Sequence, residues 1–337
     1  MGQSATDKPT PKYPFALVCP NCRNFLQLTW TPITCDRCQS EFPWVDGFPD
    51  LIVGGRFEDK YDPERTSYEE RFNEDLCANY LIPTFRELLG HGSGKPRVLS
   101  LGCGIGADVD LLAQAGFEIV GIDCGNRSEA WLCREEKHRL YLANGKNLPF
   151  EDKTFDMVYC GCVFPHVGVR GDTRDVLPDY QQERRMVARE MIRVLRPGGY
   201  VMVSSPNRLF PLDLFHGRTP EQPWPRINLP TSRFLLSASD YRRLFQSAGG
   251  NFLRLLPVQG YWGFIRMKKT LKGRLLAFPV DTVFRLVSTP LLRFLRGSPI
   301  NPWLVALFTR PGPLQVDPSS LELNSRGGRG HTTEGVG

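Results

Sequence analysis

The stretch VLSLGCGIGADVD (residues 98–110) is an apolar run that ends in a cluster of glycines. The run predicts a buried strand. The glycines predict a sharp turn into a helix that begins near Ala107, because glycine accepts positive φ angles and lets a ligand approach the backbone closely. Gly102, Gly104 and Ala107 fit the G-x-G-x-x-G/A pattern of a dinucleotide site. Gly102, Gly104 and Gly106 fit equally well the G-x-G-x-G pattern of an S-adenosylmethionine (SAM) site, so the turn alone leaves both cofactors open.

The next predicted strand, FEIVGID (117–123), ends in Asp123. An acidic residue about twenty positions after such glycines binds ribose hydroxyls in both kinds of site, so Asp123 does not decide between them. Residues 97–205 continue to alternate short β-rich runs with helical stretches. This alternation is typical of an α/β fold with a parallel sheet.

Two later segments separate the alternatives. ANGKNLPFEDKTFDMVYCGCVFPHV (143–167) resembles the third-strand loop and fourth strand of class I SAM-dependent methyltransferases of the type 11-like group. EMIRVLRPGGYVMVSSPN (190–207) resembles the helix, Leu-Arg-Pro-Gly-Gly turn and fifth strand of the same family. A dinucleotide dehydrogenase is not expected to carry these two segments. The resemblance therefore predicts a Rossmann-like class I methyltransferase sheet that uses SAM.

The resemblance also implies roles for single residues. Leu101 to Gly106 would hold the methionine half of SAM, and Asp123 would accept hydrogen bonds from its ribose. Leu148 would line the adenine pocket, and Cys160, at the end of the fourth strand, would face the same cleft. The family most often has Asp where this chain has Asn144. An Asn carbonyl still accepts a hydrogen bond from the adenine amino group, without the charge.

A second departure follows the fourth strand, where the family commonly has an aliphatic residue, Glu and His. This chain has Phe164, Pro165 and His166, so only the histidine is retained. His166 has two interpretations: a general base that removes a proton from the acceptor, or a residue that orients the loop by hydrogen bonding. Methyl transfer needs no covalent residue, because the sulfonium is already an activated donor and alignment supplies much of the acceleration.

Four cysteines near the N-terminus form two C-x2-C pairs separated by twelve residues. Cys19, Cys22, Cys35 and Cys38 are thus spaced as ligands of one tetrahedral zinc ion, and a closed four-thiolate site is structural rather than catalytic. The following QSEFPWVDGFPDLIV (39–53) resembles the zinc ribbon of the small activator subunit of tRNA and protein methyltransferases. The resemblance implies association with a methyltransferase domain, here in the same chain. We expect the two modules to have separate cores.

Composition predicts the organisation of the chain and its location. The absence of an apolar run of about 18 residues argues against a membrane-spanning helix, and the absence of an apolar secretory signal favours the cytoplasm. Gly2 and Thr6 fit the N-myristoylation pattern, which leaves acylation open. The predicted parts are a flexible tail (1–14), the zinc ribbon (15–53), a linker with a leading helix (54–94), the methyltransferase domain with its C-terminal acceptor or lid region (95–310), and a disordered tail (311–337).

The acceptor is expected to be a small apolar or aromatic metabolite. A segment after the fifth strand is rich in aromatic residues. Phe210, Phe215, His216 and Trp224, together with Asn207, form either a lid over the acceptor or part of the core. Residues 237–250 are predicted to form an amphipathic helix, with Ser239 as its N-cap. One alternative is an RNA methyltransferase that binds RNA through the zinc ribbon and a basic C-terminal segment; another is a non-catalytic methyltransferase-like partner protein.

That basic segment spans residues 265–310, with nine Lys or Arg residues and a single acid, Asp281. Its local balance of +8 exceeds the net charge of +6 of the whole chain. Apolar residues are interleaved with the charges, so three interpretations stay open: helices that pack on the core, peripheral contact with a membrane surface, and RNA binding.

Overall fold

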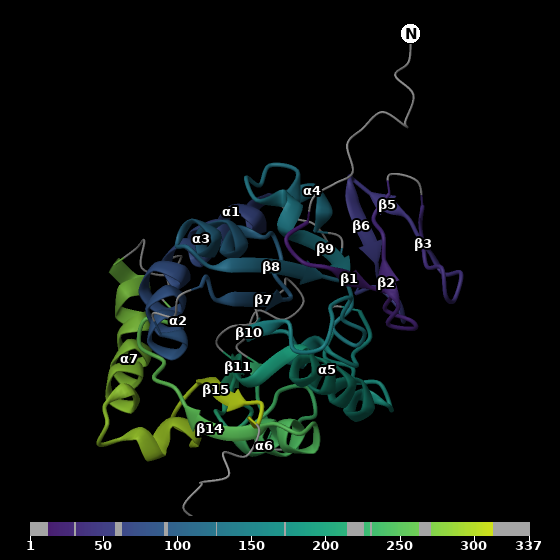
Figure 1. The fold of residues 1–337 in the computed structure, drawn as a ribbon. Helices are drawn as coiled ribbons and strands as arrows, with labels where there is room; N and C mark the ends of the chain where they lie inside the picture. The colour runs from purple at the N-terminus through teal and green to yellow at the C-terminus, as the bar shows by residue number, and fades with distance from the viewer. Residues whose placement is uncertain are drawn as a thin grey trace, which may run out of the picture.

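The computed structural model describes residues 13–29, 32–57, 63–90, 94–125, 127–171, 173–213, 226–229, 231–262 and 271–312. Its centre is a nine-stranded sheet with the order β14-β15-β11-β10-β7-β8-β9-β6-β5 (Figure 1). The seven strands from β14 to β9 form a Rossmann-like sheet: β7 (Arg97–Leu101), β8 (Glu118–Asp123), β9 (Leu140–Ala143), β10 (Phe155–Gly161), β11 (Leu195–Pro206), β14 (Asn251–Leu255) and β15 (Trp303–Thr309). The strands from β11 to β9 pair in parallel, whereas β15 runs antiparallel to β11 and β14.

Helices cover both faces of the sheet, as the predicted α/β fold requires. Alternate residues of each strand point to opposite faces, so Leu99 packs in a core with α5 and α6 while Val98 packs in a second core with α2, α3 and α7 (Figure 1). The helices are α1 (Pro63–Leu76), a π-helical turn (Cys77–Leu81), α2 (Ile82–Leu89), α3 (Ala107–Gln114), α4 (Ser128–Trp131), α5 (Tyr180–Val194), α6 (Ala238–Ser247) and α7 (Leu271–Ser288).

The remaining elements are short. The N-terminal module contains β1 (Leu17–Val18), β2 (Phe25–Leu26), β3 (Ile33–Thr34), β4 (Glu41–Phe42), β5 (Trp44–Val45) and β6 (Phe48–Leu51). A two-stranded pair follows β11 and consists of β12 (Leu212–Asp213) and β13 (Arg226–Ile227). Single 3-10 turns occur at Lys137–Arg139, Phe164–His166 and Arg293–Gly297.

The N-terminal module is part of the main sheet. Its strand β6 pairs in parallel with β9, with Asp50 opposite Leu142 and Leu51 opposite Ala143 (Figure 1). Phe15 and Leu17 of the module belong to the same hydrophobic core as Leu99. The expectation of separate cores is therefore wrong, because the short strands of the module bury their apolar side chains against the larger domain.

The helix expected over residues 237–250 is α6, but its cap lies two residues before the predicted one. The backbone N–H of Asp240 donates to Oγ of Ser237 at 3.3 Å, and the N–H of Ser237 donates to the Asp240 carboxylate at 2.7 Å. This reciprocal pair is a capping box. Ser239 lies inside the helix, so its assignment as the N-cap was wrong.

Within the described part of the chain, no helix is long and apolar enough to cross a membrane. Several predicted features lie outside the described residues and stay predictions: Gly2, the aromatic residues Phe215, His216 and Trp224, and the tail beyond residue 312.

Candidate functional site

The glycine turn after β7 adopts the backbone that its sequence predicts. Gly102, Gly104 and Gly106 have φ angles of 76°, 54° and 76°. The N–H groups of Gly102 and Cys103 both donate to the carbonyl of Ile122, at 2.8 and 3.0 Å. These hydrogen bonds hold the turn against the end of β8. Helix α3 begins directly after Gly106.

Asp123 lies beside this turn, at the end of β8. Its two carboxylate oxygens accept hydrogen bonds from the backbone N–H of Gly104, at 3.0 Å, and of Gly125, at 2.8 Å. Burial raises the pKa of Asp123, and these hydrogen bonds partly oppose that shift. The structure thus brings the glycines and the acidic residue together, as the sequence predicts; their contact with a cofactor stays a prediction.

The linker after β6 crosses this edge of the sheet, which sequence reasoning did not foresee. The side-chain amide of Asn144 donates to the carbonyl of Gly55 at 2.9 Å, and the N–H of Phe57 donates to the carbonyl of Cys124 at 3.0 Å. The carbonyl oxygen of Asn144 accepts from the N–H of Lys146 at 3.0 Å. Asn144 therefore joins the linker to the turn after β9, and one lone pair of its carbonyl remains for the predicted contact with adenine.

Leu148 and Cys160 are fully buried and belong to the core on the α5 side of the sheet. The N–H of Leu148 donates to the Glu190 carboxylate at 2.9 Å, so this turn is attached to α5. Burial also holds the pKa of the Cys160 thiol well above its usual range. The side chains of Leu148 and Cys160 thus lie within this core. Their predicted contacts with a cofactor stay predictions.

His166 lies in the 3-10 turn after β10, between two aromatic rings. Its ring meets Phe57 edge-on at a centroid distance of 5.8 Å and Phe234 at 5.6 Å. The turn is tied to the segment around Phe234 by buried Arg184, which donates to the carbonyls of Pro165 and Phe234 at 3.3 and 2.8 Å. Desolvation lowers the pKa of Arg184. This arrangement fixes the position of His166 and fits either of its predicted roles.

An aromatic cluster adjoins the same end of β10. Phe72 of α1 contacts Trp262 at a centroid distance of 4.6 Å, and Trp262 contacts Trp303 at 5.3 Å. Neighbouring Tyr261 hydrogen-bonds through its hydroxyl to Tyr159 of β10, at 3.2 Å. The glycine turn lies close to α1 as well, since a Cβ built on Gly104 would lie 3.8 Å from a carboxylate oxygen of Glu69.

The sequence left the residues between 207 and 224 open as either a lid over the acceptor or part of the core. Asn207 is fully buried, and its amide donates to the carbonyls of Ser298 and Asn301, both at 2.9 Å. Asn207 is thus a structural residue, while Phe210 is partly exposed. The cluster of Phe72, Trp262 and Trp303 was not predicted from the sequence, because its residues lie far apart in the chain.

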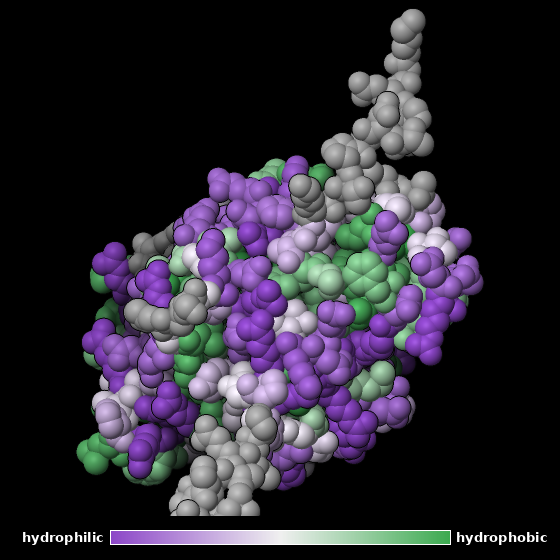
Figure 2. Space-filling view, in the orientation of Figure 1, coloured by the Kyte–Doolittle hydropathy of each residue, from purple (hydrophilic) through white to green (hydrophobic). Residues whose placement is uncertain are grey.

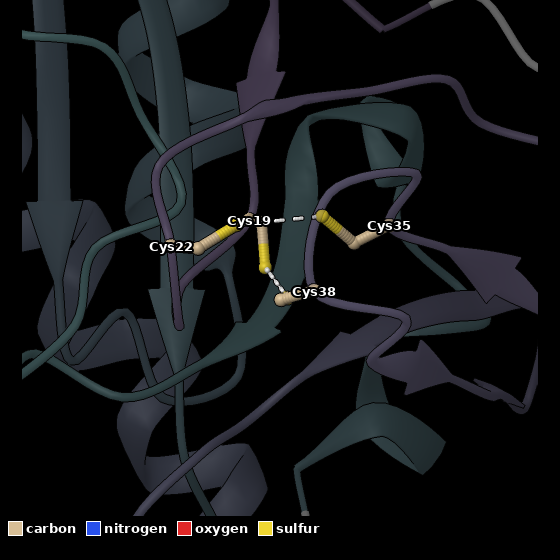
Figure 3. Close-up of side chains that lie close together, drawn as sticks. All are labelled: Cys19, Cys22, Cys35 and Cys38. Carbon is tan, nitrogen blue, oxygen red and sulfur yellow. Dashed lines mark hydrogen bonds between the residues drawn. The ribbon is translucent and has the colours of Figure 1, made fainter.

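The four predicted zinc ligands converge on one point (Figure 3). Their sulfur atoms all lie within 4.8 Å of one another, with Cys19 to Cys38 at 3.6 Å and Cys22 to Cys35 at 3.5 Å. Four thiolates at about 2.3 Å from a tetrahedral zinc ion lie about 3.8 Å apart, so this donor set fits that ion.

The two cysteine turns repeat the same backbone pattern. The N–H of Arg23 donates to the carbonyl of Cys19, and the N–H of Gln39 to that of Cys35, both at 2.8 Å. Arg23 and Gln39 both have left-handed φ angles, of 65° and 58°. Hydrogen bonds from Ser40 lower the pKa of Cys38 to about 6, whereas burial raises the pKa of Cys19 to about 12. The thiolate form that binds metal is therefore favoured at Cys38 and not at Cys19.

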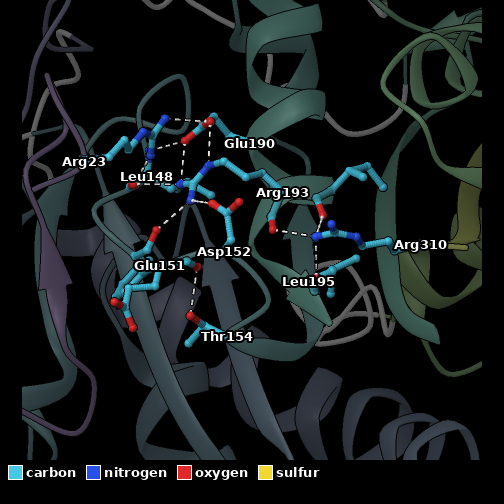
Figure 4. A network of polar contacts seen from close by, with 11 residues as sticks. Arg23, Leu148, Glu151, Asp152, Thr154, Glu190, Arg193, Leu195 and Arg310 are labelled. Atoms are coloured by element: carbon cyan, nitrogen blue, oxygen red, sulfur yellow. Dashed lines mark hydrogen bonds and ion pairs between the residues drawn. The ribbon is translucent and has the colours of Figure 1, made fainter. Parts of the chain in front are cut away.

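The first cysteine turn reaches the methyltransferase-like part of the chain through Arg23 (Figure 4). Its guanidinium donates to the carbonyl of Leu148 at 2.8 Å and pairs with the Glu190 carboxylate at 2.7 Å. Arg193 binds the same two groups, at 3.0 Å to the Leu148 carbonyl and 2.9 Å to Glu190. The turn that carries Leu148 is therefore held from two sides.

The strand order, the glycine turn and Asp123 together define a Rossmann-like fold of the class I methyltransferase kind. Comparison with known families agrees: residues 99–203 match the family model described as a methyltransferase domain. The chain therefore contains a methyltransferase domain.

Three relatives are similar to part of this chain. A protein of Mycolicibacterium smegmatis described as a probable S-adenosylmethionine-dependent methyltransferase is 30% identical over 139 residues, which cover 39% of this chain and 48% of the relative. Phthiotriol/phenolphthiotriol dimycocerosates methyltransferase 1 of Mycobacterium ulcerans is 33% identical over 33% of this chain and 37% of its own length. Norajmaline N-methyltransferase of Rauvolfia serpentina is 29% identical over 36% and 40%. The chain thus spans half or less of the length of these relatives.

Proposed function

We propose that this protein transfers a methyl group from SAM to a small apolar or aromatic metabolite. The main support is the position of the Asp123 carboxylate, which accepts hydrogen bonds from the N–H groups of Gly104 and Gly125 beside the glycine turn. Both the turn and Asp123 lie within the segment that matches a methyltransferase domain. In this proposal Asp123 accepts hydrogen bonds from the ribose hydroxyls, and the turn from Leu101 to Gly106 meets the methionine half.

The aromatic cluster supports the acceptor class. Phe72 and Trp262 are partly exposed, and Tyr261 of the same cluster touches the end of β10 where His166 follows. Ring faces of this kind bind apolar or planar molecules by dispersion and stacking. The relatives named for norajmaline and for phthiotriol support a small molecule as the acceptor.

We also propose that Cys19, Cys22, Cys35 and Cys38 hold one structural zinc ion. The support is the convergence of their sulfur atoms and the repeated backbone of the two turns. When bound, zinc would cross-link the two turns with no position left for substrate.

Calorimetric titration with SAM and with NAD tests the cofactor. We expect SAM to bind and NAD not to bind, and Asp123→Ala to weaken SAM by about 1.5 to 3 kcal/mol, the scale for hydroxyl groups that lose a charged acceptor. Asp179→Ala, which removes an exposed carboxylate at the start of α5, is the matched control and should leave SAM affinity unchanged. Binding of NAD without SAM would refute the proposal.

The acceptor is tested separately, by mass analysis of metabolites that gain a methyl group from labelled SAM in a cell extract. Trp262→Ala should then raise the KM for the identified acceptor and leave the Kd for SAM unchanged, because Trp262 lies in the aromatic cluster and not at Asp123. An equal loss of SAM affinity would place Trp262 in the cofactor site instead.

A further inference from the structure

The basic segment at the C-terminus forms a helix, α7, that is apolar on two opposite sides. At about 100° per residue, Ala277, Phe284 and Val287 share the side that packs on the sheet, and all three are buried. The opposite side faces solvent and carries what we call the α7 stripe, consisting of Leu271, Leu275, Phe278 and Leu286. Of the three interpretations left open for this segment, core packing therefore accounts for one side of α7 only.

The stripe is strongly exposed for such large apolar side chains. Leu271 is 74% exposed, Leu275 67% and Phe278 68%. Of the thirteen exposed large hydrophobic side chains in the described residues, seven lie between residues 271 and 300. They include Leu291 and Phe294 in the turn after α7, and Figure 2 shows hydrophobic surface at the lower-left edge, below α7. Such a concentration indicates a contact surface rather than scattered exposure.

The charges in the segment that carries the stripe are mostly positive. Lys272, Arg285 and Arg293 are exposed, and Asp281 is the single acid between residues 271 and 300. An exposed apolar stripe bordered by basic side chains is the pattern of a helix that lies in a membrane surface, with its apolar side in the acyl region and its cations at anionic headgroups.

Other occupants fit these observations less well. In a symmetric dimer through the stripe, each basic residue would face the same basic surface of the partner copy, with one acid per chain to compensate. RNA would bind the cations and could stack one base on Phe278, but the other three members of the stripe are aliphatic and offer it neither stacking nor hydrogen bonds. We therefore propose that the α7 stripe and its basic border bind the surface of anionic lipid bilayers. This proposal does not depend on the methyl acceptor.

Co-sedimentation of the full chain with vesicles tests the proposal. We expect binding to phosphatidylcholine vesicles that contain phosphatidylserine, and much weaker binding to phosphatidylcholine alone. The double variant Leu275→Ser/Phe278→Ser should lower the partition coefficient at least about tenfold, because two exposed apolar side chains no longer enter the bilayer. Phe25→Ser is its control, since Phe25 is also exposed but lies in the N-terminal module.

A second pair of variants tests the charges. Arg285→Glu/Arg293→Glu should also lower binding at least about tenfold at low salt, since each basic residue near the surface adds to the attraction. Arg185→Glu/Arg189→Glu changes the net charge equally on the exposed side of α5 and should have little effect. All four changes are at exposed positions, and unaltered thermal unfolding would verify that the variants are folded.

Three outcomes would overturn the proposal. The first is no sedimentation with anionic vesicles. The second is sedimentation that persists in Leu275→Ser/Phe278→Ser, which would reduce the contact to charge alone. The third is a dimer in solution that dissociates in the same variant while vesicles do not bind, which would assign the stripe to a second copy of this chain.

Discussion

Replacement of Gly102 by alanine should damage the site through one contact. An ideal Cβ on Gly102 would lie 2.2 Å from Cγ2 of Val163, and the residue has a φ angle of 76°. The left-handed backbone costs a residue with a Cβ about 1 to 2 kcal/mol, and overpacking adds about 1 to 3 kcal/mol. We therefore expect Gly102→Ala to lower the free energy of unfolding by about 2 to 5 kcal/mol.

The matched control is Gly116→Ala, at the end of α3. Gly116 also has a positive φ angle, of 98°, but nothing lies within 4 Å of its ideal Cβ. This variant should show the backbone cost alone, about 1 to 2 kcal/mol. In urea unfolding, the difference between the two variants then measures the clash with Val163. Val163→Ala in the Gly102→Ala background should recover most of that difference, a coupling that a double-mutant cycle isolates.

The contact also bears on function, because Val163 directly precedes the turn that carries His166. A shift of Val163 would move this turn relative to the glycine turn, so SAM affinity should fall in Gly102→Ala and not in Gly116→Ala. If Gly102→Ala costs no more than Gly116→Ala, or if Val163→Ala recovers nothing, the close packing of the two turns is refuted.

Three further outcomes are expected. Burial raises the pKa of Asp123 above the usual 3.8. On acidification, SAM binding should therefore weaken at a higher pH than it would if Asp123 were an exposed carboxylate. Titrations of SAM at a series of pH values check this, and Asp123→Asn should remove the dependence of SAM affinity on pH in this range. Elemental analysis should find one zinc per chain, and Cys35→Ser should lower the unfolding temperature of the whole chain in one transition, whereas a separate early transition would contradict the shared core. Burial raises the pKa of Asp108 to about 6 from 3.8, so its ionisation costs folding stability as the pH rises through that interval. Asp108→Asn has no such loss. Its free energy of unfolding in urea, compared with that of the unmodified protein, should therefore increase by about 3 kcal/mol between about pH 4 and about pH 7. A difference between the two proteins that stays constant over this pH range would contradict the raised pKa of Asp108.

The parts of the fold that the sequence predicted have local signals. The apolar run of β7, the glycines after it and the acid at the end of β8 are all read within one βαβ unit, and the structure places them together. The Cys-x2-Cys pairs are equally local, and their four sulfur atoms converge as expected. In each case short-range backbone geometry decides the arrangement.

The parts that escaped prediction depend on contacts between distant residues. The pairing of Asp50 with Leu142 has no signature in either segment, because a strand of four residues is too short to show a periodicity. The contact of Phe72 with Trp262 joins α1 to the segment that follows β14, almost two hundred residues later in the chain. For α7, the amphipathic pattern showed charges and apolar residues, but only the packed sheet shows which apolar side is buried and which faces solvent.

The attachment of the cysteine module to the methyltransferase domain rests mainly on apolar packing. The Arg23–Glu190 ion pair joins the two parts, but the Arg23 side chain is 37% exposed. Exposed ion pairs of this kind contribute about 1 kcal/mol or less to stability. Without Arg23, the Leu148 carbonyl and Glu190 would still be bound by Arg193. By contrast, Phe15 and Leu17 are almost fully buried, and each contributes about 1.5 to 3 kcal/mol on burial. The apolar contacts therefore outweigh the ion pair, which leaves Arg23 to orient the first cysteine turn against Leu148.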